Sequence, residues 1–183
     1  MSKRQGIIGA GVAIVIALLA LCAFGGVRPF RITAGSMKPE LTPGDCVVME
    51  RFMFLVRNPR RGDIVVFRAD RIPPLQDGTI YPKRIVGLPG DHLRLADGKL
   101  HVNEEHIPLK NRHGEIAYVN LPGSKYLASS SDGVTVPDGH YFFLGDNSTN
   151  SLDSRACGFL SAKSILGRLW FCYWPPKDMG VIR

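Results

Sequence analysis

Hydrophobic positions fall into two patterns along the chain: one long run near the start and many short runs after it. Residues 6–26 form a stretch of 21 residues without a charged side chain. As an α-helix this stretch would be about 31 Å long, which matches the hydrocarbon core of a bilayer. The pattern predicts a transmembrane anchor at 6–26, after a short basic N-terminus at 1–5 and before one domain at 27–183.

A cleaved signal peptide is the main alternative interpretation of the long apolar run. Such a peptide has a short apolar region and a cleavage site made of small residues. The run ends in Ala20-Leu21-Cys22-Ala23, which fits Ala-x-Ala poorly. Leu21 is also large at a position where a lipoprotein anchor on Cys22 would need a small residue. We therefore expect an uncleaved anchor.

Positive charges flank the anchor instead of covering the domain. Lys3, Arg4, Arg28 and Arg31 are the only charged residues before Ser36, and they leave +3 of the total net charge of +7 for the rest of the chain. A nucleic-acid-binding domain usually carries a strong basic stripe, so we expect no nucleic-acid partner. Charges on both flanks suit a membrane surface, but their balance leaves the orientation open.

Short apolar runs rich in β-branched and aromatic residues follow the anchor, each bounded by Gly, Pro, Asp or Asn. These runs lie at 46–49, 63–67, 84–86, 141–144 and 169–174. Residues 92–96 and 99–103 alternate around Asp97-Gly98, which predicts a hairpin. Only 161–166 looks like a short helix, and the polar stretch 111–138 reads as a surface loop or weak hairpin. The chain therefore predicts an all-β domain of small, coiled sheets.

Cysteine and histidine patterns give no sign of a metal site. The four cysteines form no Cys-x-x-C pair; Cys46 and Cys172 are expected in the core, and a Cys157–Cys172 disulfide stays open. None of the five histidines lies in a metal motif, and no Gly-x-Ser-x-Gly elbow is present. We expect no metal and no cofactor.

Three segments carry candidate chemistry. Residues 35–45 place Ser36 at a glycine-bounded bend about ten residues beyond the apolar run, and residues 81–91 place Lys83 on an apolar strand that ends in a tight turn. Residues 145–155 are dense in hydrogen-bonding groups directly after another apolar strand. Each segment alone is compatible with a purely structural role.

Together and in this order, the segments resemble the conserved boxes of the type I signal peptidase family. The similarity covers 32–45, 60–67, 81–91 and 143–159, about a third of the chain. It implies coiled antiparallel β-sheets of the signal peptidase type behind one transmembrane helix, with a small accessory β region at about 92–140.

The same resemblance implies a membrane-bound serine endopeptidase that removes signal peptides from exported preproteins after Ala-x-Ala-like sites. Its implied partners are these preproteins, membrane lipid and the secretion translocon. Its implied location is the plasma membrane, crossed once, with the catalytic domain on the outer (periplasmic or extracellular) face.

Elementary chemistry is consistent with Ser36 as nucleophile and Lys83 as general base. A serine hydroxyl needs a base to become a good nucleophile. A lysine with its ordinary pKa of about 10.4 is protonated at neutral pH, but burial lowers that pKa by disfavouring the charge. Strand alternation turns Lys83 and Arg84 to opposite sides, so Lys83 can point into an apolar site.

The resemblance also implies supporting residues. Ser151 holds the place of the family serine that orients the lysine amine. Four further residues are implied to keep the shape of the site as two ion pairs: Arg84 with Asp146, and Asp153 with Arg155.

Two residues depart from the family pattern, and both bear on substrate binding. Ala34 stands where many members have a hydroxyl that helps to bind the oxyanion, so only the Ser36 N–H is assigned to that role. Pro82 cannot donate a backbone hydrogen bond to a substrate lying along the strand edge. Pockets for small side chains are expected around Met37 and the neighbours of Lys83.

Several alternatives remain beside this interpretation. Self-cleaving SOS repressors use a similar Ser–Lys pair but are soluble and carry a DNA-binding region. A specialised pilin-type precursor peptidase is harder to separate, whereas an inactive membrane-tethered binding domain is opposed by the joint presence of Ser36, Lys83 and Ser151. Residues 52–55, beside three arginines, could contact lipid or form a core strand with a basic end.

Overall fold

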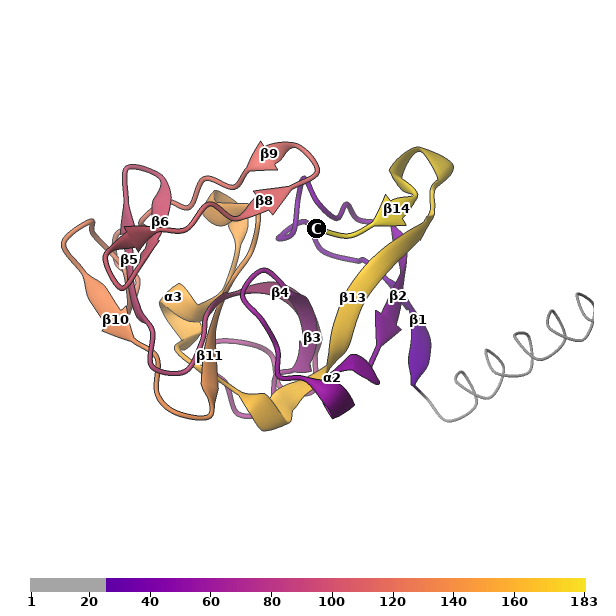
Figure 1. Cartoon of the computed structure of the whole chain (residues 1–183), viewed down its shortest axis with the longest axis horizontal. Helices are drawn as coiled ribbons and strands as arrows, with labels where there is room; N and C mark the ends of the chain where they lie inside the picture. Colours follow the sequence, from indigo (N-terminus) through magenta and orange to yellow (C-terminus); the bar gives the residue numbers. More distant parts are fainter. Residues whose placement is uncertain (1–25) are drawn as a thin grey trace, which may run out of the picture.

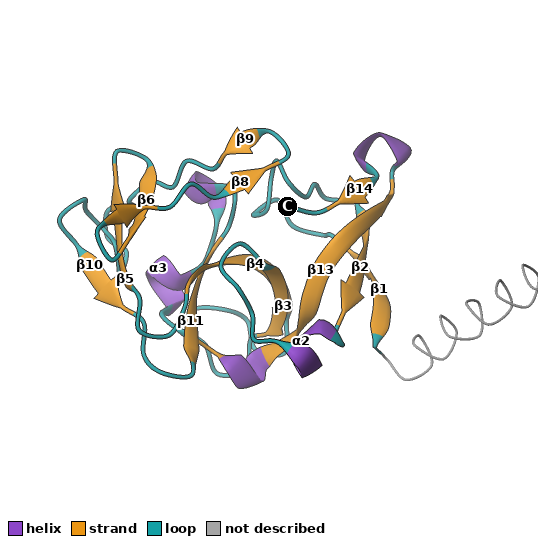
Figure 2. Ribbon diagram, in the orientation of Figure 1, coloured by secondary structure: helices purple, strands orange, loops and turns teal. Residues whose placement is uncertain are grey.

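The computed structural model describes residues 26–183, so the expected anchor at 6–26 lies outside the described residues except for Gly26. Within this part of the chain, no helix has the length and apolar character needed to cross a membrane. Antiparallel strands dominate, with a few short helices at their ends (Figures 1 and 2). The all-β class expected from the apolar pattern is confirmed.

An eight-stranded antiparallel sheet forms the larger part of the domain, in the order β1-β2-β13-β3-β4-β11-β12, with β14 beside β13. Its strands are β1 (Val27–Arg31), β2 (Cys46–Glu50), β3 (Ile64–Arg68), β4 (Ile80–Gly87), β11 (His140–Leu144), β12 (Leu160–Ser161), β13 (Ile165–Trp174) and β14 (Gly180–Val181). Register shifts within β13 accompany its pairing with both β2 and β3. Such irregularities bend and twist a strand, which suits a strongly coiled sheet.

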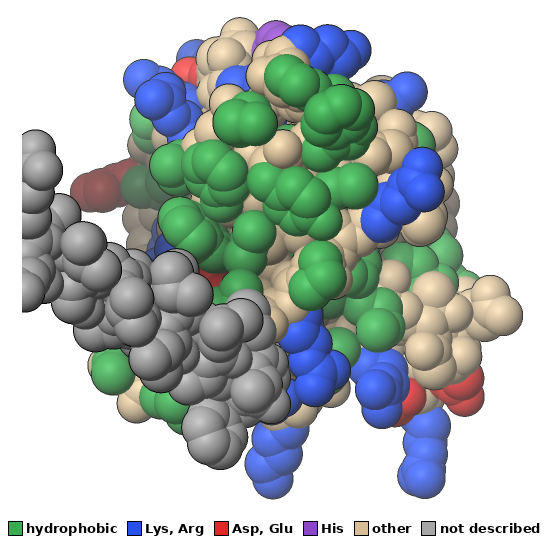
Figure 3. Space-filling model, turned by 90° about the vertical axis from the view of Figure 1, so that its right-hand side faces the viewer, with side chains coloured by type: hydrophobic (Ala, Val, Ile, Leu, Met, Phe, Trp, Pro, Cys, Tyr) green, Lys and Arg blue, Asp and Glu red, His purple; other side chains and the backbone are tan. Residues whose placement is uncertain are grey.

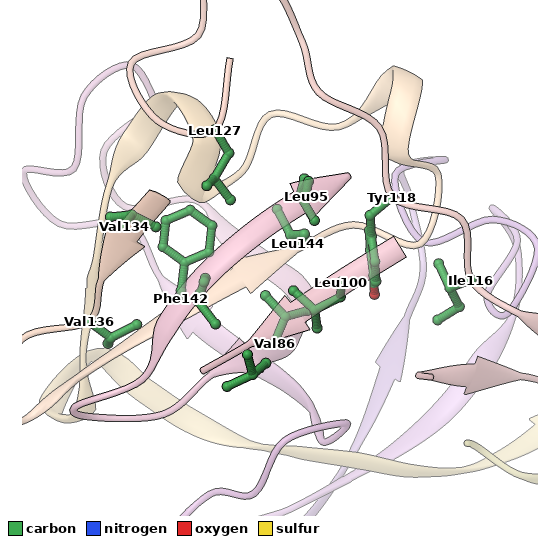
Figure 4. Packing of buried hydrophobic residues seen from close by; sticks show 12 residues of the cluster. Val86, Leu95, Leu100, Ile116, Tyr118, Leu127, Val134, Val136, Phe142 and Leu144 are labelled. Carbon is green, nitrogen blue, oxygen red and sulfur yellow. The ribbon is translucent and has the colours of Figure 1, made fainter. Parts of the chain in front are cut away.

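A four-stranded sheet, in the order β10-β5-β6-β7, packs against the large sheet at its strands β4 and β11. It consists of β5 (His92–Ala96), β6 (Lys99–Val102), β7 (Glu105–His106) and β10 (Gly133–Thr135), and a two-stranded hairpin of β8 (Lys110–Asn111) and β9 (Gly114–Glu115) lies apart from it. Figure 4 shows the shared core, in which Phe142 and Leu144 of β11 meet Leu95 and Leu100. The two sheets therefore share one continuous apolar layer.

The hairpin expected around Asp97-Gly98 is confirmed. Ala96 pairs with Lys99 across a two-residue turn. Asp97 and Gly98 both have positive φ, 51° and 74°. Two consecutive residues of this kind are typical of a type I′ turn, whose twist matches that of the flanking strands.

Two expectations from the sequence are corrected by the structure. The short helix expected at 161–166 is only the 3₁₀ turn η2 (Ala162–Ser164), because Ile165 already pairs with Phe67 in the sheet. Residues 52–55 do not form a core strand: α2 (Met53–Val56) lies at the surface, where Leu55 is 86% exposed. In both places tertiary context, not local apolar content, decides the structure.

Three cysteines lie in the described part of the chain, and all three are free thiols there. Cys172 on β13 is buried in the core, as expected, whereas Cys46 is only half-buried. The disulfide between Cys157 and Cys172, which the sequence left open, is therefore not formed in this structure.

Candidate active site

Ser36 lies on a turn that is held at both ends by the core. Ile32 and Met37 are 1% and 0% exposed and belong to the same apolar cluster as Leu41. The Leu41 N–H donates to the Met37 carbonyl at 2.9 Å. Ser36 stands between these anchors and is half-buried, so the core holds its backbone in place.

Lys83 is buried on β4 and has a hydroxyl as its hydrogen-bond partner. Its side chain is 1% exposed, and Nζ lies 3.0 Å from Oγ of Ser151. Burial lowers the pKa of the amine to about 8, although the Asp153 carboxylate and the Cys157 thiol act in the opposite direction. A substantial fraction of Lys83 is therefore neutral near pH 8 and able to accept a proton.

Arg84, the next residue along β4, points the other way and is fully paired. Its Nε and Nη2 donate to the two carboxylate oxygens of Asp146 at 2.8 and 2.6 Å. Nη1 donates to the Gly62 carbonyl at 2.9 Å. The expected pair of Arg84 and Asp146 is formed, with both side chains almost inaccessible to solvent.

The expected pair of Asp153 and Arg155 is also formed and fixes the loop that carries Ser151. Arg155 donates to Asp153 through Nε at 2.8 Å and Nη2 at 2.7 Å, and it also reaches the Ser148 carbonyl at 2.7 Å. Asp153 in turn accepts the Gly145 N–H at 3.1 Å. The loop between β11 and α3 (Ser154–Cys157), which includes η1 (Ser148–Asn150), is thereby closed on itself.

Two residues of this loop connect the serine to the lysine. The Asn147 N–H donates to the Ser36 carbonyl at 3.0 Å, and its side-chain amide donates to the Gly35 carbonyl at 3.2 Å. Gly145 fills the space between the Ser36 carbonyl and the Ser151 side chain so tightly that a Cβ there would collide with both. Ser36 and Ser151, the hydrogen-bond partner of Lys83, thus meet at Gly145.

Sequence reasoning singled out the segment containing Gly145 and Asn147 but gave neither residue a part in the site. The available signal was a Gly-Asp-Asn run directly after an apolar strand. A glycine in such a place indicates close approach of another backbone, but the sequence does not say which one.

Donors and acceptors around Ser36 leave room for a reaction. Within residues 26–183, neither the Ser36 N–H nor its hydroxyl has a hydrogen-bond partner, so both are available to a ligand. Ala34 beside them is exposed. The other residues expected to contact substrate lie deeper: Pro82 is buried on β4, and Met37 is fully enclosed in the core below the turn.

No group of three or more metal-ligating side chains occurs among residues 26–183. The described residues supply a half-buried serine on a fixed turn, a buried amine hydrogen-bonded to Ser151, and a Ser36 backbone N–H without a partner. These are the parts needed for acyl transfer by a serine nucleophile.

Comparison with known proteins identifies the family. A sequence model described as "Signal peptidase, peptidase S26" matches residues 5–174. A probable signal peptidase I-2 from Synechocystis sp. is 34% identical over 163 residues, which cover 86% of this chain and 70% of that protein. A signal peptidase I from Pseudomonas aeruginosa is 32% identical, covering 84% of this chain and 67% of that protein.

Among solved structures, a signal peptidase I from Enterococcus faecalis is 30% identical and covers 62% of this chain and 97% of that one, with a TM-score of 0.47. The protein is a serine endopeptidase. More narrowly, the chain belongs to the signal peptidase family, peptidase S26.

Proposed function

We propose that this protein is a membrane-bound endopeptidase that removes signal peptides from exported preproteins after Ala-x-Ala-like sites. Neutral Lys83 takes the proton of the Ser36 hydroxyl as its oxygen attacks the scissile carbonyl. The Ser36 N–H stabilises the developing oxyanion. Protonated Lys83 then gives its proton to the leaving amine, and water, activated by the same amine, releases the acyl group.

The buried amine of Lys83 carries this proposal. An enclosed lysine normally has a carboxylate beside it, as Arg84 has. Lys83 instead meets only the neutral hydroxyl of Ser151 at hydrogen-bond distance, and its pKa falls to about 8. A site that merely needed a structural cation would gain nothing from suppressing its charge, whereas a general base requires it.

An open sheet edge supports the binding of an extended substrate. Residues 84–87 of β4 pair with β11, whereas residues 80–83 have no partner on that side among the described strands. The Ala69 N–H donates to the Thr79 carbonyl, and the Ile85 N–H donates to the Asp63 carbonyl. The backbone N–H and C=O groups of the odd-numbered residues of β4 therefore point toward β3. The backbone groups of Ile80 and Pro82 therefore point to the open edge of β4, where a peptide strand could add to the sheet.

Pro82 limits that pairing. Its outward position offers a carbonyl but no N–H, so a substrate strand along β4 would find donors only at neighbouring residues. β1 has one open edge as well, because it pairs only with β2. We propose that the substrate lies between these two edges, with its small side chains directed toward the floor that Met37 supports.

Exposed apolar residues support a location at the membrane. The exposed fractions are 38–66% for Trp170, Tyr173 and Trp174 on β13, Met179 directly after η3 (Pro176–Asp178), and Val181 on β14. Figure 3, which views this side, shows hydrophobic side chains gathering there with Lys and Arg side chains around them. Aromatic residues next to cations are typical of a protein surface at the lipid interface.

We therefore assign residues 6–26 as a single-pass anchor and 27–183 as a catalytic domain on the outer face, with the smaller sheet within 92–140 as its accessory region. Preproteins emerging from the translocon would meet this domain at the membrane surface, where tethering raises the effective concentration.

The test is cleavage by the full chain in lipid vesicles of a preprotein with an Ala-x-Ala site, with the new N-terminus identified by mass. We expect a cut after the second alanine that disappears in Ser36→Ala and Lys83→Ala proteins of unchanged thermal stability or better. Cleavage that persists in Lys83→Ala would exclude the proposed base. Absence of cleavage by the unchanged protein would exclude the function.

A further inference from the structure

A cavity rimmed by three arginines lies between β1 and β4, outside the catalytic group. Its volume is about 260 Å³. Apolar side chains form its walls and cations its rim: Phe30, Val66, Ile80, Arg28, Arg51 and Arg68. Phe30 and Arg28 come from β1, and Ile80 comes from the unpaired part of β4, so the cavity is bordered by both open edges.

The cavity lies on the path of an extended peptide bound at the site. Arg68 pairs with Ile80, and Val66 pairs with Pro82, so these four residues share one face of the sheet. Ile80 precedes Lys83 by three residues, a distance of roughly 10 Å along a strand. The Lys83 side chain is on the opposite face of β4, but a peptide bound along the strand edge borders both faces. With its scissile bond at Ser36 and Lys83, such a peptide would pass Ile80 with about its third residue and cross the arginine rim beyond it.

The direction of the peptide follows from the membrane, and this step rests on the proposed function. β1 begins at Val27, directly after the expected anchor, so the arginine end of the path is the membrane end. A signal peptide carries its apolar segment N-terminal to the cleavage site. The cavity thus faces the residues that precede the scissile bond, and its arginine rim faces those about four to six positions before it.

The arginine charges have no counter-charge within the protein. None of the three belongs to an ion pair among residues 26–183. Residues 1–25 contain no Asp or Glu that could supply one. Three guanidinium groups around an apolar hollow favour a carboxylate on a ligand and oppose an ammonium group.

We propose that Arg28, Arg51 and Arg68 make the enzyme select its substrates by charge. A preprotein with Asp or Glu four to six residues before the scissile bond is preferred over one with a neutral residue there, and Lys or Arg at these positions is rejected. The selection adds to the requirement for small residues next to the cleaved bond and is independent of it.

The experiment uses the full chain in zwitterionic vesicles and three preproteins that differ only five residues before the scissile bond, with Glu, Gln or Lys. We expect kcat/KM about tenfold higher for Glu than for Gln and lower still for Lys, with the ratio shrinking as salt rises. In the triple variant Arg28→Gln, Arg51→Gln, Arg68→Gln the three preproteins become nearly equal. A control that removes three exposed lysines elsewhere, Lys99→Gln, Lys110→Gln, Lys163→Gln, keeps the tenfold ratio.

Equal cleavage of the Glu and Gln preproteins by the unchanged protein overturns the proposal, and so does a ratio that survives the triple variant. Arginine variants that lose binding to vesicles of anionic phospholipid while keeping the ratio would assign the cavity to lipid phosphate instead.

Binding of the same peptides to the Ser36→Ala protein separates this inference from the proposed function. If the unchanged protein cleaves nothing, an arginine-dependent preference of Ser36→Ala for the Glu peptide still supports charge selection. Equal binding of the Glu and Gln peptides there overturns it.

Discussion

Two adjacent residues of β4 show how one protein treats two buried cations in opposite ways. Lys83 and Arg84 are each 1% exposed. Arg84 has a carboxylate on two of its nitrogens and a carbonyl on the third, which keeps its pKa raised despite burial. Lys83 has a hydroxyl, and burial lowers its pKa to about 8.

The pKa values of Lys83 and Arg84 shift in opposite directions because their hydrogen-bond partners differ, not because one side chain is more deeply buried. Burial penalises both charges, and only a hydrogen-bonded anion offsets the penalty. Asp153 is near enough to influence Lys83, but its oxygens are taken by Arg155 and the Gly145 N–H. The ion pair of Asp153 with Arg155 thus keeps a carboxylate close to the lysine without giving the lysine a counter-ion.

Replacing Lys83 by Met gives the largest expected effect and separates activity from stability. We expect kcat/KM to fall at least about 10³-fold, because the proposed general base is gone. The folded-state pKa of Lys83 lies below its ordinary 10.5, so folding releases a proton between pH 8 and 10.5 and stability rises across that window. At pH 7 the whole penalty is present, and removing the amine should stabilise the protein by about 1–3 kcal/mol.

Thermal unfolding of the full chain at pH 7 and the cleavage assay measure the two effects. The matched control is Lys163→Met at an exposed position, which should change neither the melting temperature nor kcat/KM. A lower melting temperature for Lys83→Met would contradict the description of Lys83 as a destabilising buried cation.

Breaking the ion pair of Arg84 with Asp146 should destabilise the protein, in contrast to the removal of Lys83. Arg84→Met leaves the Asp146 carboxylate buried without its partner, and we expect a loss of about 3–5 kcal/mol in unfolding free energy. The double variant Arg84→Met, Asp146→Leu should recover most of it, because no uncompensated charge remains. Denaturant unfolding followed by tryptophan fluorescence measures both; a loss below about 1 kcal/mol in the single variant would show that the pair is not needed.

Ser151→Ala tests whether the hydroxyl partner positions the amine. We expect kcat to fall by about tenfold to a hundredfold with KM little changed, because a misplaced base loses alignment with the Ser36 hydroxyl. Ser129→Ala, in an exposed loop, is the control. An equal rise in KM would instead indicate a role in substrate binding.

The pH dependence gives the most direct signal, because it needs no substitution. In the proposed mechanism the neutral amine of Lys83 is the active form, so kcat/KM should fall about tenfold per pH unit below 8 and level off above it. Rates between pH 5.5 and 9.5 for a substrate without titratable groups check this expectation. A profile that levels off near pH 6 would mean a base other than Lys83.

Much of the fold could be predicted from local pattern, because strands and turns leave local signals. The alternation around Asp97-Gly98 predicted the hairpin, and the apolar runs predicted β2, β3, β11 and β13. β1 was missed, since Val27–Arg31 contains Pro29 and two arginines and becomes a strand only by pairing with β2. α2 was missed because nothing local shows that Leu55 and Val56 stay exposed.

The candidate site, too, was predictable only in part from the sequence. Resemblance supplied Ser36, Lys83, Ser151 and the two ion pairs, because these residue types lie in recognisable segments. The closeness of Gly145 to the Ser36 carbonyl arises only when segments more than a hundred residues apart meet. The arginine cavity likewise joins Arg28, Arg51 and Arg68 from separate strands or their ends. Such features depend on sheet order, which no local pattern contains.

The unpaired stretch of β4 has one more consequence, which concerns solubility. An open strand edge can pair with the same edge of another copy, and this is a common route to aggregation. Pro82 removes a donor in the middle of the stretch, and the arginines nearby make two such edges repel each other. The proline that limits pairing with the proposed substrate would also weaken unwanted pairing between copies of the chain.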